Sequence, residues 1–165
     1  MNVEQIFAEH YDGLFRYLVK LTGDPDAAAD AAQEAFVRLV EREPNGAQIR
    51  AWLFRVATNV VRDDSRVRRR RIELLRESPD RAPIGDAPVN AEAELEIREK
   101  RKMVRGALDA LNEKERTILL MREEGFSHQE IAEAVGTTTK SVGSMIARAF
   151  NKLSAELAQR SETRE

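Results

Sequence analysis

Arginines recur at helical spacing between residues 50 and 71, in a pattern suited to binding phosphate groups. Arg66 follows Arg62 by four residues, and Arg69 and Arg70 follow Arg66 by three and four. Side chains at these intervals are neighbours on a helix surface. The segment holds eight arginines against two acidic residues, a net charge of +6, whereas the stretches on either side are net acidic. A helix so charged can neutralise several phosphates of a nucleic acid.

Two other side chains in this segment bear on that interpretation. Asn59 carries an amide that can hydrogen-bond a base edge, although it could equally cap a local turn. Trp52 could stack on an unpaired base, but its spacing from Leu53 and Val56 favours a core position. The arginines could also belong to a solvated helix end and pair with acids of the same chain. We favour nucleic acid, because a second feature of the chain points the same way.

That second feature is a predicted helix-turn-helix near the end of the chain. Ser127 and Glu130 have the spacing of a capping box, which marks a helix start. Gly136 can then turn at positive φ, and a second helix is expected from about Thr138. Such a pair of helices commonly places its second helix in the DNA major groove, although helical hairpins also occur in bundles that bind no nucleic acid. The buried side of the second helix is predicted to consist of Val142, Ile146, Ala149 and Leu153.

The remaining pattern predicts an all-α protein. Aromatic residues are only 5% of the chain and charged residues 34%, which favours helices over a large β structure. Apolar spacing and capping residues predict three helices before residue 75, and helix resumes near Ala91. Three of the five prolines fall between residues 79 and 88, which predicts a flexible linker. We therefore expect two small helical domains at 1–75 and 95–157, a linker at 76–94 and a tail at 158–165.

The sequence lacks the residues that several classes of function require. The chain has no cysteine, and His10 and His128 have no metal-ligand spacing, so we expect neither a metal nor another cofactor. A glycine-rich phosphate loop and a nucleophile–base pair are also missing, so an enzyme is not expected. No apolar run is long enough for a membrane span, and the N-terminus lacks a signal-peptide core. These features fit a cytoplasmic protein.

Four segments, in this order, resemble a bacterial RNA polymerase sigma factor. They read DAAQEAF at 30–36, WLFRVATN at 52–59, LNEKERTILLMREEGFSHQEIAEAVG at 111–136 and KSVGSMIARAFNKL at 140–153. The small size, with two domains and a linker, is similar to the extracytoplasmic-function group. The resemblance implies core RNA polymerase and promoter DNA as partners, with an anti-sigma factor as a further partner that none of these residues identifies.

The resemblance also implies roles for individual residues. The loop Pro44–Gln48 would hold a base flipped out of the non-template strand, and the stretch Asn59–Arg71 would meet the minus-ten promoter element. Phe36 is expected in the core. The face directed at the polymerase would be Asp30, Gln33 and Glu34. The minus-ten contacts would come from Asn59, Arg62, Arg66, Arg69 and Arg70. The minus-thirty-five element would be read by Lys140, Ser141, Ser144, Ala147 and Arg148.

The last helix departs from the family pattern. Gly143, Met145 and Phe150 stand where similar factors usually carry basic residues, and Gly143 weakens the helix by roughly 0.5–1 kcal/mol relative to Ala. We therefore expect weaker binding to the minus-thirty-five element. More of the affinity for DNA would come from the arginine band, the basic stretch near Arg66 to Arg71. Two alternatives remain: a stand-alone helix-turn-helix regulator acting as a dimer on duplex DNA, and a helical adaptor that binds no DNA. A flexible linker would leave the two DNA-binding domains uncoupled in the isolated protein.

Overall fold

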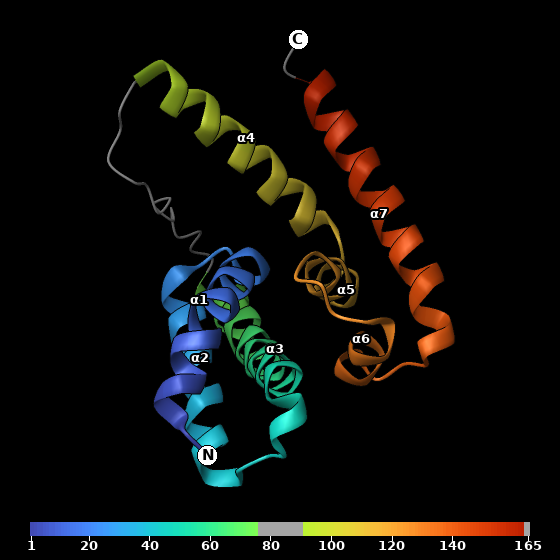
Figure 1. Ribbon diagram of the computed structural model, residues 1–165. Helices are drawn as coiled ribbons and strands as arrows, with labels where there is room; N and C mark the ends of the chain where they lie inside the picture. The colour runs from blue at the N-terminus through green and yellow to red at the C-terminus, as the bar shows by residue number, and fades with distance from the viewer. Residues whose placement is uncertain (76–90, 164–165) are drawn as a thin grey trace.

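The computed structural model describes residues 1–75 and 91–163, with the side chains of residues 65–75 outside the description. Its elements within these ranges are helical, which confirms the predicted all-α class (Figure 1). In chain order they are α1 (Val3–Thr22), α2 (Pro25–Arg42), a short 3-10 helix η1 (Gly46–Gln48), α3 (Ile49–Leu75), α4 (Ala91–Ala110), α5 (Glu113–Glu123), α6 (His128–Val135) and α7 (Thr139–Glu162).

The boundaries between the first helices follow from local chemistry. Gly23 ends α1 in the left-handed region at φ 69°, a conformation in which a side chain would be strained. The Asp24 carboxylate then accepts hydrogen bonds from the amides of Asp26 and Ala27, at 3.1 and 3.4 Å. Pro25 occupies the first helical position, where its missing amide removes no hydrogen bond. These three neighbouring residues therefore end α1 and begin α2.

Small residues let α2 lie close to its neighbours in the N-terminal half, which comprises α1, α2 and α3. Four alanines of α2 are fully buried, and they lack side chains that would hold the helices apart. Phe36 is only 7% exposed and belongs to this core, as expected. The alanines are Ala28, Ala31, Ala32 and Ala35.

The C-terminal half, α4 to α7, is organised around a second set of capped helices. A capping box formed by Asn112 and Glu115 begins α5, as the spacing predicts. Figure 1 shows α5 and α6 beside the N-terminal half, while α4 and α7 extend away from it. Within α7, Val142 and Ala149 are fully buried, whereas Ile146 and Leu153 are partly exposed. The predicted apolar stripe is thus fully buried at two of its four positions, Val142 and Ala149.

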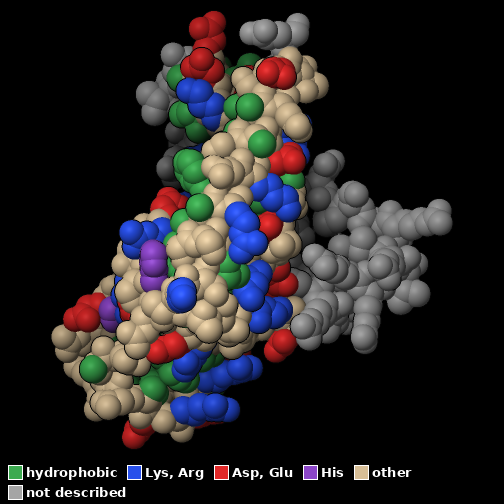
Figure 2. All heavy atoms as spheres, turned by 90° about the vertical axis from the view of Figure 1, so that its right-hand side faces the viewer, with side chains coloured by type: hydrophobic (Ala, Val, Ile, Leu, Met, Phe, Trp, Pro, Cys, Tyr) green, Lys and Arg blue, Asp and Glu red, His purple; other side chains and the backbone are tan. Residues whose placement is uncertain are grey.

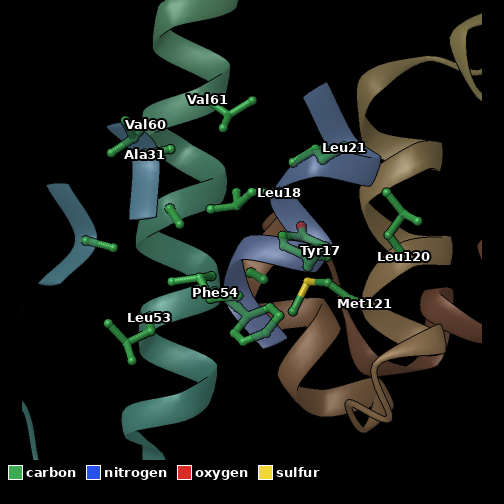
Figure 3. Close-up of a cluster of buried hydrophobic side chains, with 14 of the residues drawn as sticks. Tyr17, Leu18, Leu21, Ala31, Leu53, Phe54, Val60, Val61, Leu120 and Met121 are labelled. Carbon is green, nitrogen blue, oxygen red and sulfur yellow. The ribbon is translucent and has the colours of Figure 1, made fainter. Parts of the chain in front are cut away.

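The two halves share one hydrophobic cluster, so the described structure is not the uncoupled pair expected from the linker. Tyr17 and Leu21 of α1 lie between Phe54 of α3 and the α5 residues Leu120 and Met121 (Figure 3). All five side chains are at least 95% buried. The prediction failed because linker composition reports on the tether and not on the surfaces that it joins. Most of the predicted linker, residues 76–90, lies outside the described residues.

Candidate nucleic-acid interface

The helix-turn-helix is built as its sequence predicts. The Ser127 hydroxyl accepts from the Glu130 amide at 3.1 Å, and the Glu130 carboxylate accepts from the Ser127 amide at 3.0 Å. Gly136 ends α6 at φ 73°, and its amide donates to the Ala132 carbonyl at 2.9 Å. Thr138 caps α7 by accepting from the Ser141 amide at 3.3 Å. These local bonds set the direction in which α7 leaves the turn.

The outward face of α7 carries two cations and few free polar groups. Lys140, Ser144 and Arg148 are exposed and Ser141 is partly exposed. The Ser144 hydroxyl donates to the Ser141 carbonyl at 3.0 Å, so part of its bonding capacity is used within the helix. Ala147, also exposed, completes this face. Figure 2 views the molecule from the side on which α7 lies and shows Lys and Arg side chains mixed with Asp and Glu on this side.

The arginine band lies on the far part of α3, a helix of 27 residues. Asn59 is exposed on this helix, next to the buried Thr58 and Val60. Arg62 is partly exposed, and its Nε lies 3.7 Å from the Glu113 carboxylate at the start of α5. The side chains of the other three predicted contacts lie outside the described residues. These are Arg66, Arg69 and Arg70.

A cavity of about 300 Å³ opens beside the predicted base-binding loop. Asn45 and Gln48 of the loop line it together with Trp52 and Arg55 of α3. Trp52 is partly exposed and also packs against the hydrophobic cluster, so the core position predicted for it holds only in part. The lining also includes the acidic residues Glu130 and Glu133 of α6.

The predicted polymerase-facing residues share the solvent-exposed side of α2. Asp30 and Gln33 are exposed, and the Glu34 side chain is 44% exposed. Arg38 donates to the Glu34 carboxylate at 2.8 Å, an exposed pair of the kind that adds little stability. Val37, on the same side, is 51% exposed. This face therefore combines acidic, amide and apolar groups away from the contact between the halves.

An arginine and a phenylalanine that sequence reasoning did not single out join the two halves. Arg50 of α3 lies over the Phe126 ring at 4.1 Å from its centroid and donates to the Glu124 carbonyl at 2.6 Å. The Phe126 ring meets Phe54 edge-on at 4.8 Å, and both rings are buried. The sequence held one signal for this contact, a phenylalanine directly after the turn at Gly125. A large aromatic side chain at the end of a turn suggests that another part of the protein packs against it.

Charged side chains surround this aromatic contact. Arg16 donates through two nitrogens to the Glu124 carboxylate, at 3.3 and 3.1 Å, and this hydrogen bonding raises the pKa of Arg16. Lys20 pairs with Glu123 at 2.9 Å. Beneath them, the buried Tyr17 hydroxyl lies 2.8 Å from the Thr58 hydroxyl, and burial raises the pKa of Tyr17.

Within residues 1–75 and 91–163 no three His, Asp or Glu side chains gather as a metal site would require. None of the described helices has the length and apolar character needed to cross a membrane.

Known families match both halves of the chain. Residues 6–71 match the family described as Sigma-70 region 2, and residues 101–153 match the family described as Sigma-70, region 4. The ECF RNA polymerase sigma factor EcfG of Rhodopseudomonas palustris is 32% identical over 153 residues, covering 86% of this chain and 77% of that protein. The chain belongs to the ECF RNA polymerase sigma factors. It is a sigma factor of transcription initiation, and the predicted family is confirmed. These matches do not favour the alternative of a stand-alone dimeric regulator.

Two further comparisons place this sigma factor among its relatives. The ECF sigma factor SigE of Mycolicibacterium smegmatis is 31% identical over 162 residues, and the match spans 96% of this chain but 62% of that relative. A solved structure of the sigma factor RpoE with the anti-sigma factor NepR, from Bartonella quintana, has a TM-score of 0.75 at 21% identity. The superposition covers 94% of this sigma factor and 96% of the RpoE chain, so the fold is shared.

Proposed function

We propose that this sigma factor binds core RNA polymerase and directs promoter recognition in the cytoplasm, without catalytic activity of its own. The proposal rests on one observation: each half of the protein has an exposed polar helix face, and both faces lie in segments that match sigma-70 regions. One face lies on α2 and includes Asp30 and Gln33, and the other lies on α7 and includes Lys140 and Arg148. Their exposure supports simultaneous contact with an enzyme and with DNA.

The α2 face is proposed as the polymerase contact. Asp30 and Glu34 supply two carboxylates, Gln33 supplies an amide between them, and the exposed Val37 adds apolar surface. A basic partner surface would be attracted by the carboxylates and could bury the valine. Because the four buried alanines of α2 hold its opposite side in the core, the face is presented on a rigid element.

Promoter contacts are proposed on two elements. On α3, Asn59 would hydrogen-bond a base edge while Arg62, Arg66, Arg69 and Arg70 neutralise phosphates of the minus-ten element. On α7, the minus-thirty-five element would be read from the major groove, with the two cations positioning the helix on the backbone. The residues proposed for α7 are Lys140, Ser141, Ser144 and Arg148.

Docking on the polymerase would combine these two weak contacts. When two DNA-binding surfaces are held at a fixed separation, the second binds at a high effective concentration once the first is engaged. The isolated sigma factor should therefore bind duplex promoter DNA poorly. A nanomolar, sequence-specific complex between the free protein and duplex promoter DNA would contradict this mechanism.

Co-purification with core polymerase, followed by run-off transcription over a promoter library, tests the proposal. Asp30→Asn/Glu34→Gln should reduce polymerase binding, because it removes two carboxylates from the α2 face. The matched control is Glu9→Gln/Asp12→Asn, which removes the same charge from exposed positions on α1. The proposal fails if the unmodified protein binds polymerase without selecting start sites, and the assignment of the α2 face fails if both double variants bind alike.

An anti-sigma factor is a further proposed partner. The support is the solved relative of the same fold, which was crystallised with the anti-sigma factor NepR. Co-purification from a strain that produces the tagged sigma factor would test whether such a partner exists.

A further inference from the structure

The outward face of α7 includes an asparagine that is not among the predicted DNA contacts. Asn151 is exposed, and it lies nine residues after the fully buried Val142. Because an α-helix turns by about 100° per residue, nine residues correspond to a rotation of about 180° from Val142. The Asn151 side chain therefore lies on the side of α7 that faces away from the core, together with Ser144 and Ala147.

The Asn151 amide is free to bind a ligand, whereas earlier polar groups on this face already have partners within the chain. The Ser141 hydroxyl lies 2.8 Å from the Thr138 hydroxyl, and the Ser144 hydroxyl donates to the Ser141 carbonyl at 3.0 Å. The Nε of Arg148 donates to the Ser144 carbonyl at 3.4 Å. Within the part of the chain that the structure describes, the side-chain amide of Asn151 makes no hydrogen bond.

The surroundings of Asn151 suit the approach of DNA. Ala147, one turn before it, is exposed and carries only a methyl group, so it does not hold a base edge away from the amide. The next residue, Lys152, pairs with the Glu115 carboxylate of α5 at 3.2 Å. The helix has no acidic residue before Glu156, so its first turns present no carboxylate that would repel phosphate.

An asparagine amide in the major groove is suited to adenine. Its oxygen accepts from the N6 amino group of adenine while its nitrogen donates to N7, and no other base offers this pair of groups in the major groove. Asn151 follows Ser144 by seven residues, a rise of about 10.5 Å along the helix. Since neighbouring base pairs are about 3.4 Å apart, the two side chains would reach bases about three positions apart. Both bases would therefore lie within one short DNA element.

We propose that Asn151 is a specificity-determining residue of the minus-thirty-five contact and selects an adenine on one of the two strands. The inference rests on the proposed placement of α7 in the major groove, and it adds a selected base to that placement. Serine hydroxyls pair with several bases, and the cations Lys140 and Arg148 suit phosphate or guanine. A preference for adenine is therefore a property of the amide and not of the other proposed contacts.

The first test is run-off transcription by the holoenzyme over a promoter library randomised in the minus-thirty-five region. The unmodified sigma factor should favour adenine at one position by about five- to a hundredfold, the range expected for one bidentate contact between an amide and adenine. Asn151→Ala should abolish this preference at that position alone. Alanine has a higher helix propensity than asparagine, so unfolding of α7 would not explain the loss.

A second substitution and a matched control sharpen this test. Asn151→Asp should shift the preference at the same position toward cytosine, because a carboxylate accepts from the N4 amino group of cytosine. Gln159→Ala removes an exposed amide from the same helix, about two turns beyond Asn151, and should leave every base preference unchanged. If Asn151→Ala weakens all promoters equally, the amide contacts phosphate and the inference is overturned.

A second measurement separates this inference from the proposed function. The full chain, immobilised without polymerase, enriches a random duplex library at low salt, where phosphate contacts strengthen binding. If the holoenzyme shows no start-site choice but the enriched duplexes carry an adenine that Asn151→Ala removes, the proposed function fails and the inference holds. If start sites are selected but neither assay shows an adenine preference that depends on Asn151, the inference fails and the proposed function holds. If both results are negative, both are refuted.

Discussion

One substitution made at two glycines should shift stability in opposite directions. Gly136 ends α6 at φ 73°, and a Cβ added there would meet nothing within 4 Å. The penalty of Gly136→Ala is therefore conformational, about 1–2 kcal/mol for an L-residue in the left-handed region. Gly143 lies within α7, where an added Cβ would lie 3.8 Å from Cε1 of His128, an ordinary contact. Gly143→Ala should thus stabilise by about 0.5–1 kcal/mol.

Urea denaturation followed by far-ultraviolet circular dichroism measures both effects. With a slope of about 1–3 kcal/mol per molar urea, Gly136→Ala should lower the midpoint by roughly 0.5–1 M, and Gly143→Ala should raise it by a smaller amount. The slopes must match that of the unmodified protein for the comparison to report stability. A neutral Gly136→Ala would refute the requirement for a left-handed turn, and a destabilising Gly143→Ala would show that α7 needs the open space at that position.

Two further predictions concern DNA and pH. In polymerase holoenzyme, Arg69→Ala/Arg70→Ala should weaken promoter binding more than Lys140→Ala/Arg148→Ala and lower the salt-dependence slope by about 2, because each phosphate contact contributes about 0.9. If Lys140→Ala/Arg148→Ala weakens promoter binding as much or more, the proposal that the arginines of α3 contribute more of the affinity is refuted. Burial keeps Tyr17 protonated in the folded state after it ionises in the unfolded state, so stability from this group is full below about pH 10 and declines above it. Tyr17→Phe should make urea midpoints fall less steeply between pH 10 and 11, and an unchanged slope would contradict this origin.

Features encoded by neighbouring residues could be predicted from the sequence. The capping boxes at Asn112 and Ser127 and the left-handed Gly136 each depend on a few adjacent positions, and the structure has them where expected. Partners distant in sequence could not be predicted in this way. Phe54 is buried against Phe126, 72 positions later, and neither spacing nor propensity indicates that pairing. Phe7 of α1 is 45% exposed although its ring centroid lies 5.0 Å from that of Phe36, an exposure that helical periodicity does not indicate.

The alanine row of α2 also limits how this helix can vary. An alanine contributes little surface, so the helix is positioned by close approach and not by bulk. Leucine at Ala32, which is fully buried, would push α2 outward and tilt it. The loop at 44–48 begins just beyond the end of α2, so the same tilt would displace the cavity beside this loop together with the exposed face of α2. The lack of space around Ala32 would thus fix the distance between the two surfaces that we propose for the polymerase and for the melted strand.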